Sequence, residues 1–189
     1  MRCWRFRPGA PERECVLGRG PLHELHRPTL RFRDKPGDYA RLAQELNSLL
    51  AGESDRIANA ANTAALIFAA LPGINWAGFY FLRGTELVLG PFQGKPACVR
   101  IGLGQGVCGA AAAQRRTLVV PDVKKFPGHI TCDAASRAEI VVPLLEAGTL
   151  IGVLDIDSPV AGRFDEADAR GLETLAALLV GSSAARPAR

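Results

Sequence analysis

The chain has 189 residues, of which 48% are hydrophobic, so it is long enough to form one domain with a buried core. No apolar run approaches the roughly 18 residues that cross a bilayer, and the N-terminus has no apolar signal segment. These features predict a cytoplasmic protein without a membrane partner.

The formal net charge of +4 is unevenly distributed along the chain. Residues 1–33 contain eight Arg and three Glu, or 8 − 3 = +5, so the other residues carry 4 − 5 = −1. A nucleic-acid partner is therefore not expected, because recognition of nucleic acid needs a basic face on the folded domain. Residues 1–35 are rich in Arg and Pro and have no helical or strand period, which predicts a disordered or loosely packed extension.

Two helices are predicted to begin the domain, which we expect over residues 36–180, with a tail at 181–189. The first is indicated by apolar residues that recur at helical spacing from Tyr39 to Leu50. The second opens at Asp55 and is stopped by the Pro-Gly pair at 72–73.

Strands predominate in the rest of the predicted domain, which closes with a helix over 165–179 capped by Asp165. Because most of these strands are joined as hairpins and helices lie at both ends, we expect an α+β fold. Its antiparallel six-stranded sheet would be flanked by helices, packed on one face. The predicted strands cover residues 75–82, 86–90, 97–101, 117–120, 139–145 and 149–156.

A glycine-rich segment, Gly104-x-Gly106-x-x-Gly109, has the letters of a dinucleotide-binding motif. It lacks the long preceding strand, and Lys124 and Lys125 occupy the place of the ribose-binding acid, so we interpret it instead as a tight bend before a helix at 107–114. Cys108 lies at the start of that helix, where the partial positive charge of the N-terminus favours a thiolate.

Three cysteines, Cys98, Cys108 and Cys132, fall within the predicted domain. In a cytosolic chain of this length, clustered cysteines are more often catalytic, redox-active or metal-binding than structural disulfides. A zinc site with His129 is a weak alternative, because structural zinc ligands usually occur in closely spaced pairs. Cys98 suits a buried position better than the others, whereas Cys132 lies in a polar loop that suits a nucleophile.

Three acidic residues, Glu139, Asp155 and Asp157, flank apolar strands. Asp155 and Asp157 share one face of their strand, and the predicted hairpin brings Glu139 to the same end. The alternative is a solvated turn, but carboxylates beside apolar runs are placed to bind a cation such as an ammonium group, or to share a proton.

Trp76 and Tyr80 lie four residues apart on one predicted strand and so share a face. The simpler interpretation is an ordinary core pair. The functional alternative is an aromatic wall for a small apolar or cationic group.

Together these segments resemble free methionine-(R)-sulfoxide reductases, a family built on the GAF fold, over residues 36–180. GAF folds usually sense ligands, so the three cysteines within their own motifs carry the specificity. The matching segments are Asn75-Trp-Ala-Gly-Phe-Tyr80, Gly90-Pro-Phe-Gln-Gly-Lys-Pro-Ala-Cys98, Gly104-Gln-Gly-Val-Cys108-Gly, Val120-Pro-Asp-Val, Pro127-Gly-His-Ile-Thr-Cys132-Asp, Glu139-Ile-Val-Val-Pro143 and Gly152-Val-Leu-Asp155-Ile-Asp157-Ser.

The resemblance implies that Cys132 is the nucleophile, that Cys108 resolves, and that Cys98 joins the disulfide relay. The acids Glu139, Asp155 and Asp157 would hold the substrate, with Trp76 and Tyr80 around its methyl end. The implied reaction is reduction of free L-methionine (R)-S-oxide through a sulfenic acid and a disulfide, recycled by thioredoxin, with no bound cofactor or metal. The arrangement of helices is compatible with a homodimer. The alternative is a non-enzymatic GAF ligand or redox sensor.

Overall fold

The computed structural model describes residues 32, 34–130 and 132–184. The predictions for residues 1–31 and 185–189 lie outside the described residues. Phe32 belongs to the predicted extension, yet it is buried and contacts Tyr39 edge-to-face at 5.1 Å between ring centroids. Within the described part of the chain, no helix is long and apolar enough to cross a bilayer.

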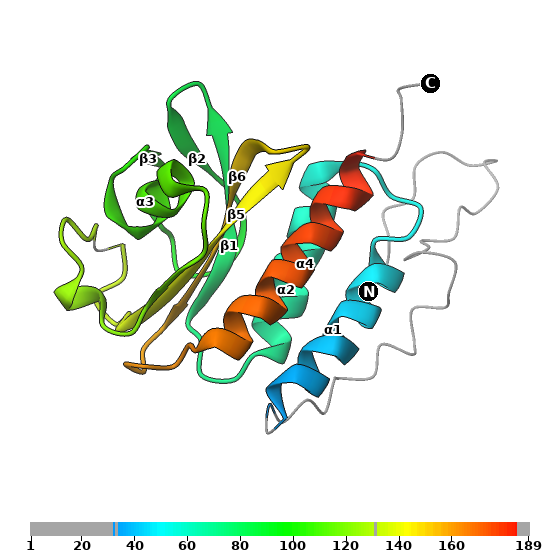
Figure 1. Ribbon diagram of the computed structural model, residues 1–189, viewed down its shortest axis with the longest axis horizontal. Helices are drawn as coiled ribbons and strands as arrows, with labels where there is room; N and C mark the ends of the chain where they lie inside the picture. The colour runs from blue at the N-terminus through cyan, green and yellow to red at the C-terminus, as the bar shows by residue number, and fades with distance from the viewer. Residues whose placement is uncertain (1–31, 33, 131, 185–189) are drawn as a thin grey trace, which may run out of the picture.

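The fold is a six-stranded sheet with four helices around it (Figure 1). The strand order is β3-β2-β1-β6-β5-β4, and every neighbouring pair is antiparallel, which confirms the predicted α+β class. In chain order the elements are α1 (Lys35–Leu49), α2 (Arg56–Ala70), β1 (Trp76–Arg83), β2 (Glu86–Gly94), β3 (Arg100–Gly102), α3 (Gly106–Gln114), β4 (Leu118–Val120), the 3-10 turn η2 (Val123–Lys125), β5 (Ala138–Glu146), β6 (Thr149–Ser158) and α4 (Glu166–Ala184).

Both predicted helix caps are present. The Asp55 carboxylate accepts hydrogen bonds from the first backbone N–H groups of α2, and Asp165 does the same for α4. Such caps satisfy N–H groups that have no partner inside the helix. Helix α4 continues to Ala184, so its last turn occupies the first part of the predicted tail.

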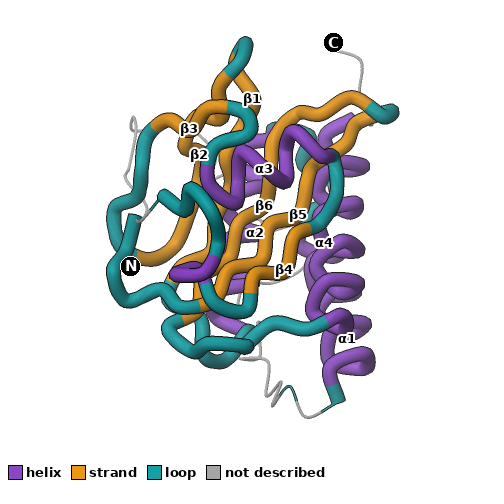
Figure 2. The backbone as a smooth tube through the Cα atoms, turned by 60° about the vertical axis from the view of Figure 1, so that its left-hand side comes forward, coloured by secondary structure: helices purple, strands orange, loops and turns teal. Residues whose placement is uncertain are grey.

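The prediction that the helices pack on one face of the sheet was wrong for one helix. α1, α2 and α4 lie on one side, whereas α3 lies on the other, together with the loops (Figures 1 and 2). The chain reaches that side because α3 connects β3 and β4, the strands at the two opposite edges of the sheet. This crossover creates a second, smaller core between α3 and the sheet, so the sheet separates α3 from the other three helices.

Two strand predictions need correction. The strand that was expected to end at Gly90 continues to Gly94, because Gly90 and Pro91 form a bulge opposite Phe79. A bulge accommodates a proline that has no N–H for the ladder. The segment expected as a strand at 97–101 pairs only from Arg100 to Gly102, which leaves residues 95–99 as a loop.

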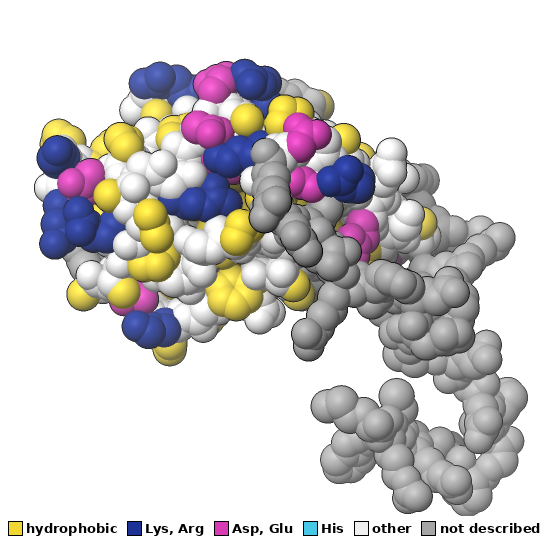
Figure 3. Space-filling view, turned by 90° about the horizontal axis from the view of Figure 1, so that it is seen from below, with side chains coloured by type: hydrophobic (Ala, Val, Ile, Leu, Met, Phe, Trp, Pro, Cys, Tyr) yellow, Lys and Arg dark blue, Asp and Glu magenta, His cyan; other side chains and the backbone are white. Residues whose placement is uncertain are grey.

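Charges of both signs are interspersed on the surface. On the face drawn in Figure 3, Lys and Arg side chains alternate with Asp and Glu, and no stripe of one sign crosses that face. The expectation that the chain has no nucleic-acid partner stays a prediction.

Candidate active site

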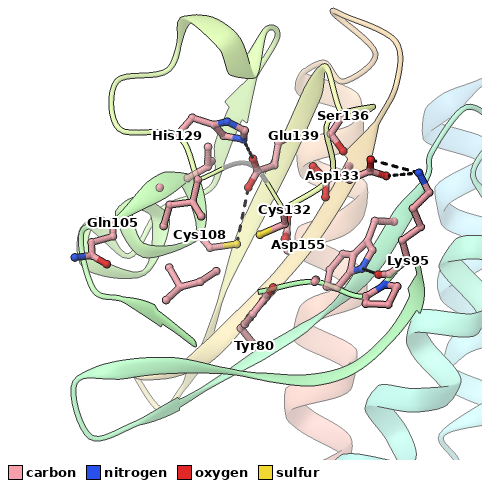
Figure 4. A pocket seen from close by; sticks show the side chains of 18 residues that line it. Tyr80, Lys95, Gln105, Cys108, His129, Cys132, Asp133, Ser136, Glu139 and Asp155 are labelled. Carbon is pink, nitrogen blue, oxygen red and sulfur yellow. Dashed lines mark hydrogen bonds and ion pairs between the residues drawn. The ribbon is translucent and has the colours of Figure 1, made fainter. Parts of the chain in front are cut away.

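A pocket lies on the α3 side of the sheet, where β1, β5 and β6 meet the loop after β2 and the loop before β5 (Figure 4). All eight residues that the sequence indicated contribute to this region. The side chains that line the pocket include Trp76, Tyr80, Cys108, Cys132, Glu139, Asp155 and Asp157, and Cys98 is bonded to one of them.

The acidic side chains meet as the hairpin predicted. Glu139 on β5 stands opposite Asp157 on β6, and Asp155 lies two residues away on the same face. Glu139 and Asp155 are both buried, and one carboxylate oxygen of Asp155, Oδ1, has no hydrogen-bond partner among the described residues. A buried acceptor without a partner is costly, so it marks a place where a donor from a ligand would bind.

Burial and mutual repulsion keep protons in this cluster. Loss of solvation, followed by the nearby Asp157, raises the pKa of Glu139 well above its usual value. Loss of solvation, followed by Glu139, does the same for the pKa of Asp155. Burial also raises the pKa of Asp157 to about 6, with His129 opposing the rise. Burial and the nearby like charges therefore favour the protonated forms of these carboxyls more than in a solvated carboxylic acid.

Cys108 lies in the first turn of α3, directly beside these acids. Its Sγ is 3.8 Å from Glu139 Oε1, to which the thiol donates a hydrogen bond (Figure 4). The expectation that the helix N-terminus favours its thiolate was wrong. Burial, together with the charges of Asp155 and Glu139, raises the pKa of the Cys108 thiol well above its usual value. These effects outweigh the helix dipole, so the thiol stays protonated.

The glycine-rich segment before α3 forms the expected tight bend. Gly104 and Gly106 both have positive φ, and the Gly104 N–H donates to the Gly109 carbonyl oxygen at 2.8 Å. A side chain on Gly109 would collide with the Gly102 carbonyl, so glycine is needed there for close packing. The bend brings the first N–H groups of α3 to the pocket.

A disulfide joins Cys98 and Cys132, whose Cα atoms are 5.7 Å apart. Cys132 is exposed and Cys98 is half-buried, so the expectation that Cys98 is the most buried of the three was wrong. Cys108 is the free cysteine of the described residues and is buried. The pairing also argues against the zinc alternative, because sulfurs bonded to one another are not available as thiolate ligands.

The aromatic pair shares one face, as predicted. The rings of Trp76 and Tyr80 stack with centroids 6.0 Å apart, and Trp76 also stacks on Phe92 at 5.4 Å. Trp76 stands opposite Asp157 in the β1–β6 pairing, so the aromatic wall adjoins the acids.

Sequence reasoning missed three polar side chains that line the pocket, Lys95, Asp133 and Ser136, and one beside it, Asn75. Asn75 donates to Asp133 at 3.2 Å and to Ser136 at 3.1 Å, and Lys95 forms an ion pair with Asp133 at 3.3 Å. His129 was considered as a metal ligand; its Nε2 is 3.7 Å from Glu139 Oε2. Their closeness in sequence to the cysteines could have indicated them as pocket residues, since Asp133 follows Cys132 directly and Lys95 precedes Cys98 by three residues.

One group of side chains has the composition of a small-cation site. Ligand atoms of Cys108, Glu139 and Asp155 lie within 4.8 Å of one another. The absence of a metal requirement therefore stays a prediction.

The chain is similar to known proteins both in its domain type and along most of its sequence. The family model described as a GAF domain matches residues 43–181, so this is a GAF-domain protein. The free methionine-R-sulfoxide reductase of Escherichia coli is 55% identical over 141 residues, which cover 75% of this chain and 86% of that protein. The enzyme of the same name from Saccharomyces cerevisiae is 46% identical over 136 residues, covering 68% and 76%.

Solved structures agree. Free methionine-R-sulfoxide reductase from Neisseria meningitidis, in complex with its substrate, is 48% identical with a TM-score of 0.77, covering 80% of this chain and 91% of that one. The chain belongs to the family of free methionine-R-sulfoxide reductases.

Proposed function

We propose that this protein reduces free L-methionine (R)-S-oxide to methionine by thiol chemistry, with Cys132 as the nucleophile. The observation that carries the proposal is the disulfide between Cys98 and Cys132 beside a pocket that holds three acids. A redox pair at a pocket for a small cationic molecule is what such a reductase needs. The reaction requires no bound cofactor, because the thiols supply both electrons.

The acid cluster fits the ammonium group of a free amino acid. Asp155 offers a buried oxygen without a partner, and Glu139 and Asp157 add negative charge around it. A methionine sulfoxide inside a peptide has an amide in place of this ammonium group. Pairing a buried carboxylate with a cation offsets its loss of solvation, so the cluster selects the free amino acid.

The N-terminus of α3 fits the carboxylate of the same substrate. Gly106, Val107 and Cys108 line the pocket, and the first helical N–H groups have no carbonyl partner within the helix. Such groups bind anions. The substrate backbone would thus lie between α3 and the acids, and its methyl end would face Trp76 and Tyr80.

The first chemical step is attack by the Cys132 thiolate on the sulfoxide sulfur. The sulfoxide is electrophilic only when its oxygen is protonated, and the raised pKa of Glu139 keeps a proton available for it, while Asp155 pairs with the ammonium group. Attack transfers the oxygen to Cys132 as a sulfenic acid and releases methionine. Cys132 suits this role better than Cys108, because it is exposed whereas Cys108 is buried beside acids that raise the pKa of its thiol.

The second step is condensation of the sulfenic acid with a thiol. The observed pair supports Cys98 as the direct partner of Cys132, and Cys108 as a group of the substrate pocket or a later member of the relay. The resemblance named Cys108 and Cys98 as members of the relay without ranking them, and we place Cys98 first. Thioredoxin, or another cytosolic dithiol, would then attack the exposed Cys132 sulfur and restore the enzyme.

A homodimer is a further part of the proposal. Ile57 and Phe68 lie on one face of α2 and are 51% and 36% exposed, so this face offers apolar surface that a second copy of the chain could cover. Light scattering of the purified protein would show a mass of two chains if this face is an interface.

The test of the function is turnover of the two epimers of free methionine sulfoxide with a thioredoxin system. We expect the R epimer to be consumed and the S epimer to be spared. Cys132→Ser should abolish methionine formation without lowering the melting temperature, whereas the matched control Cys15→Ser should retain wild-type turnover.

The alternative function, a non-enzymatic GAF sensor, predicts a different outcome. Such a protein would bind methionine sulfoxide by calorimetry but form no methionine with any dithiol. Methionine formation that persists in Cys132→Ser would instead move the nucleophile to another thiol.

A further inference from the structure

Two polar atoms of β1 contact the segment that carries Cys98. The Trp76 indole Nε1 donates to the Lys95 carbonyl oxygen at 3.1 Å, and the Tyr80 hydroxyl donates to the Cys98 carbonyl oxygen at 3.0 Å. Both side chains come from the buried face of the strand, with exposed fractions of 4% and 1%. The aromatic wall therefore also binds the backbone of the loop above it.

The segment that carries Cys132 is fixed to the same end of β1. The Asn75 amide, directly before the strand, donates to Asp133 and to Ser136 at 3.2 and 3.1 Å. Lys95 and Asp133 then join the two segments by an ion pair (Figure 4). One short stretch of chain, residues 75–80, thus holds the segments on both sides of the disulfide.

We propose that β1 aligns the two redox cysteines, and that the Tyr80 hydroxyl is a positioning residue that holds Cys98 within reach of Cys132 when the disulfide closes. This role rests on the proposed function, which makes Cys132 the thiol that is oxidised first. It concerns the second step and is distinct from contact between the Tyr80 ring and the substrate.

The step in question is the condensation of the Cys132 sulfenic acid with the Cys98 thiol. The S–S bond forms and the S–O bond breaks; the hydroxyl leaves with the Cys98 proton as water. No oxidant or reductant is added, because Cys132 was already oxidised by the sulfoxide. The rate depends on how often the two sulfurs meet, so an anchor on the Cys98 backbone raises it.

The hydrogen bond from Tyr80 matters because Cys98 lies between two strands, after the end of β2 at Gly94 and before the start of β3 at Arg100. Residues 95–99 lie in a loop, in which Ala97 and Cys98 pack against the smaller core and the Leu89 N–H donates to the Val99 carbonyl oxygen at 3.0 Å. The Tyr80 hydroxyl adds a side-chain hydrogen bond to the carbonyl of Cys98 itself. Burial, and then the charge of Asp155, raises the pKa of Tyr80. The hydroxyl therefore remains protonated and able to donate throughout the neutral range.

The test compares Tyr80→Phe with Tyr39→Phe. Each removes one buried hydroxyl, but that of Tyr39 donates to Asp168 in the helix layer, away from the pocket. Reduced protein is mixed with excess free methionine (R)-sulfoxide without reductant. Rapid quenching measures methionine, and trapping with dimedone measures the lifetime of the Cys132 sulfenic acid.

We expect Tyr80→Phe to close the disulfide about tenfold more slowly than the wild type, and to lose more in the rate of closure than in the rate of methionine formation. Tyr39→Phe should close it at the wild-type rate. The same anchor should stabilise the disulfide at equilibrium, so titration against glutathione should show the potential of Tyr80→Phe less negative by about 30 mV, the equivalent of tenfold. Asp133→Ala, which breaks the ion pair between the segments, should slow closure about threefold.

Wild-type closure and potential in a folded Tyr80→Phe would overturn the proposal, as would equal slowing of methionine formation and closure. If Tyr80→Phe does not fold, unchanged closure in Asp133→Ala overturns it. The glutathione titration needs no substrate, so it tests the alignment even if methionine is never formed. Failure of the proposed function is seen separately, as absence of methionine from the wild-type protein.

Discussion

The two faces of the sheet are built from alternate residues of the same strands but differ in content. The side facing α1, α2 and α4 is apolar, and its strand residues Phe79, Ile140, Leu154 and Ile156 are all fully buried. The other side contains the acids, the aromatic pair and Cys108. Strand period places Ile156 in one core and its neighbours Asp155 and Asp157 in the pocket.

Alternate residues of β6 therefore have different roles: those facing the helix layer stabilise the fold, and those facing the pocket would act on the substrate. The helix layer buries apolar area, which stabilises the fold. The pocket face buries carboxylates with raised pKa values, which destabilise the free protein until a cation binds. Substitutions one residue apart in β6 should therefore have opposite consequences.

The largest effect is expected for activity on the pocket face. Asp155→Asn should lower kcat/KM about a hundred- to a thousandfold, because it removes the charge that pairs with the substrate ammonium. Its melting temperature should be no lower than that of the wild type, since a carboxyl with a raised pKa has been removed. The control Glu166→Gln, an exposed acid at the start of α4, should leave both unchanged. If Asp155→Asn lost stability but kept its activity, the assignment of substrate binding to the pocket face of the sheet would be wrong.

On the opposite face, Ile156→Ala should lower the free energy of unfolding by about 3 kcal/mol, because it leaves a cavity in the helix-layer core. Denaturant unfolding measures the loss, and the folded fraction should keep most of its activity. Val160→Ala shortens a side chain that follows β6 and is 53% exposed, and should change stability by less than about 0.5 kcal/mol. Equal losses in the two variants would be inconsistent with the structure.

A smaller effect is expected from pH. Burial raises the pKa of Asp157 from 3.8 to about 6, so the folded state binds the proton more tightly than the unfolded chain. Stability from this group is fully present below pH 3.8 and is lost as pH rises through 6, by about 3 kcal/mol in total, of which about 2 kcal/mol is lost between pH 4 and 8. Unfolding of the wild type and Asp157→Asn between pH 4 and 8 should show the variant gaining relative stability as pH rises. A difference that does not vary with pH would refute the assignment.

Much of the pocket could be predicted because strands alternate. The alternation placed Asp155 and Asp157 on one face, and the hairpin turn at 147–148 brought Glu139 to the same end. The same logic placed Trp76 beside Tyr80. These features involve residues close in sequence, and the two-residue alternation of strands together with the residues of the turn is enough to predict them.

Other features depend on contacts between distant segments. The pairing of Cys98 with Cys132 requires two loops, separated by 34 residues, to meet above β1. The position of α3 depends on a crossover between the two edge strands, which its short, alanine-rich sequence does not reveal. The protonated state of Cys108 follows from its burial among acids, which is a property of the folded pocket.

The central claim is that Cys132 reacts first and that Cys98 closes the disulfide. The most direct measurement is a non-reducing peptide map of the reduced protein after reaction with one equivalent of free methionine (R)-sulfoxide. We expect one methionine released per chain, a single disulfide between Cys98 and Cys132, and an unmodified thiol at Cys108. A bond that contains Cys108, or methionine released with no disulfide formed, would contradict it.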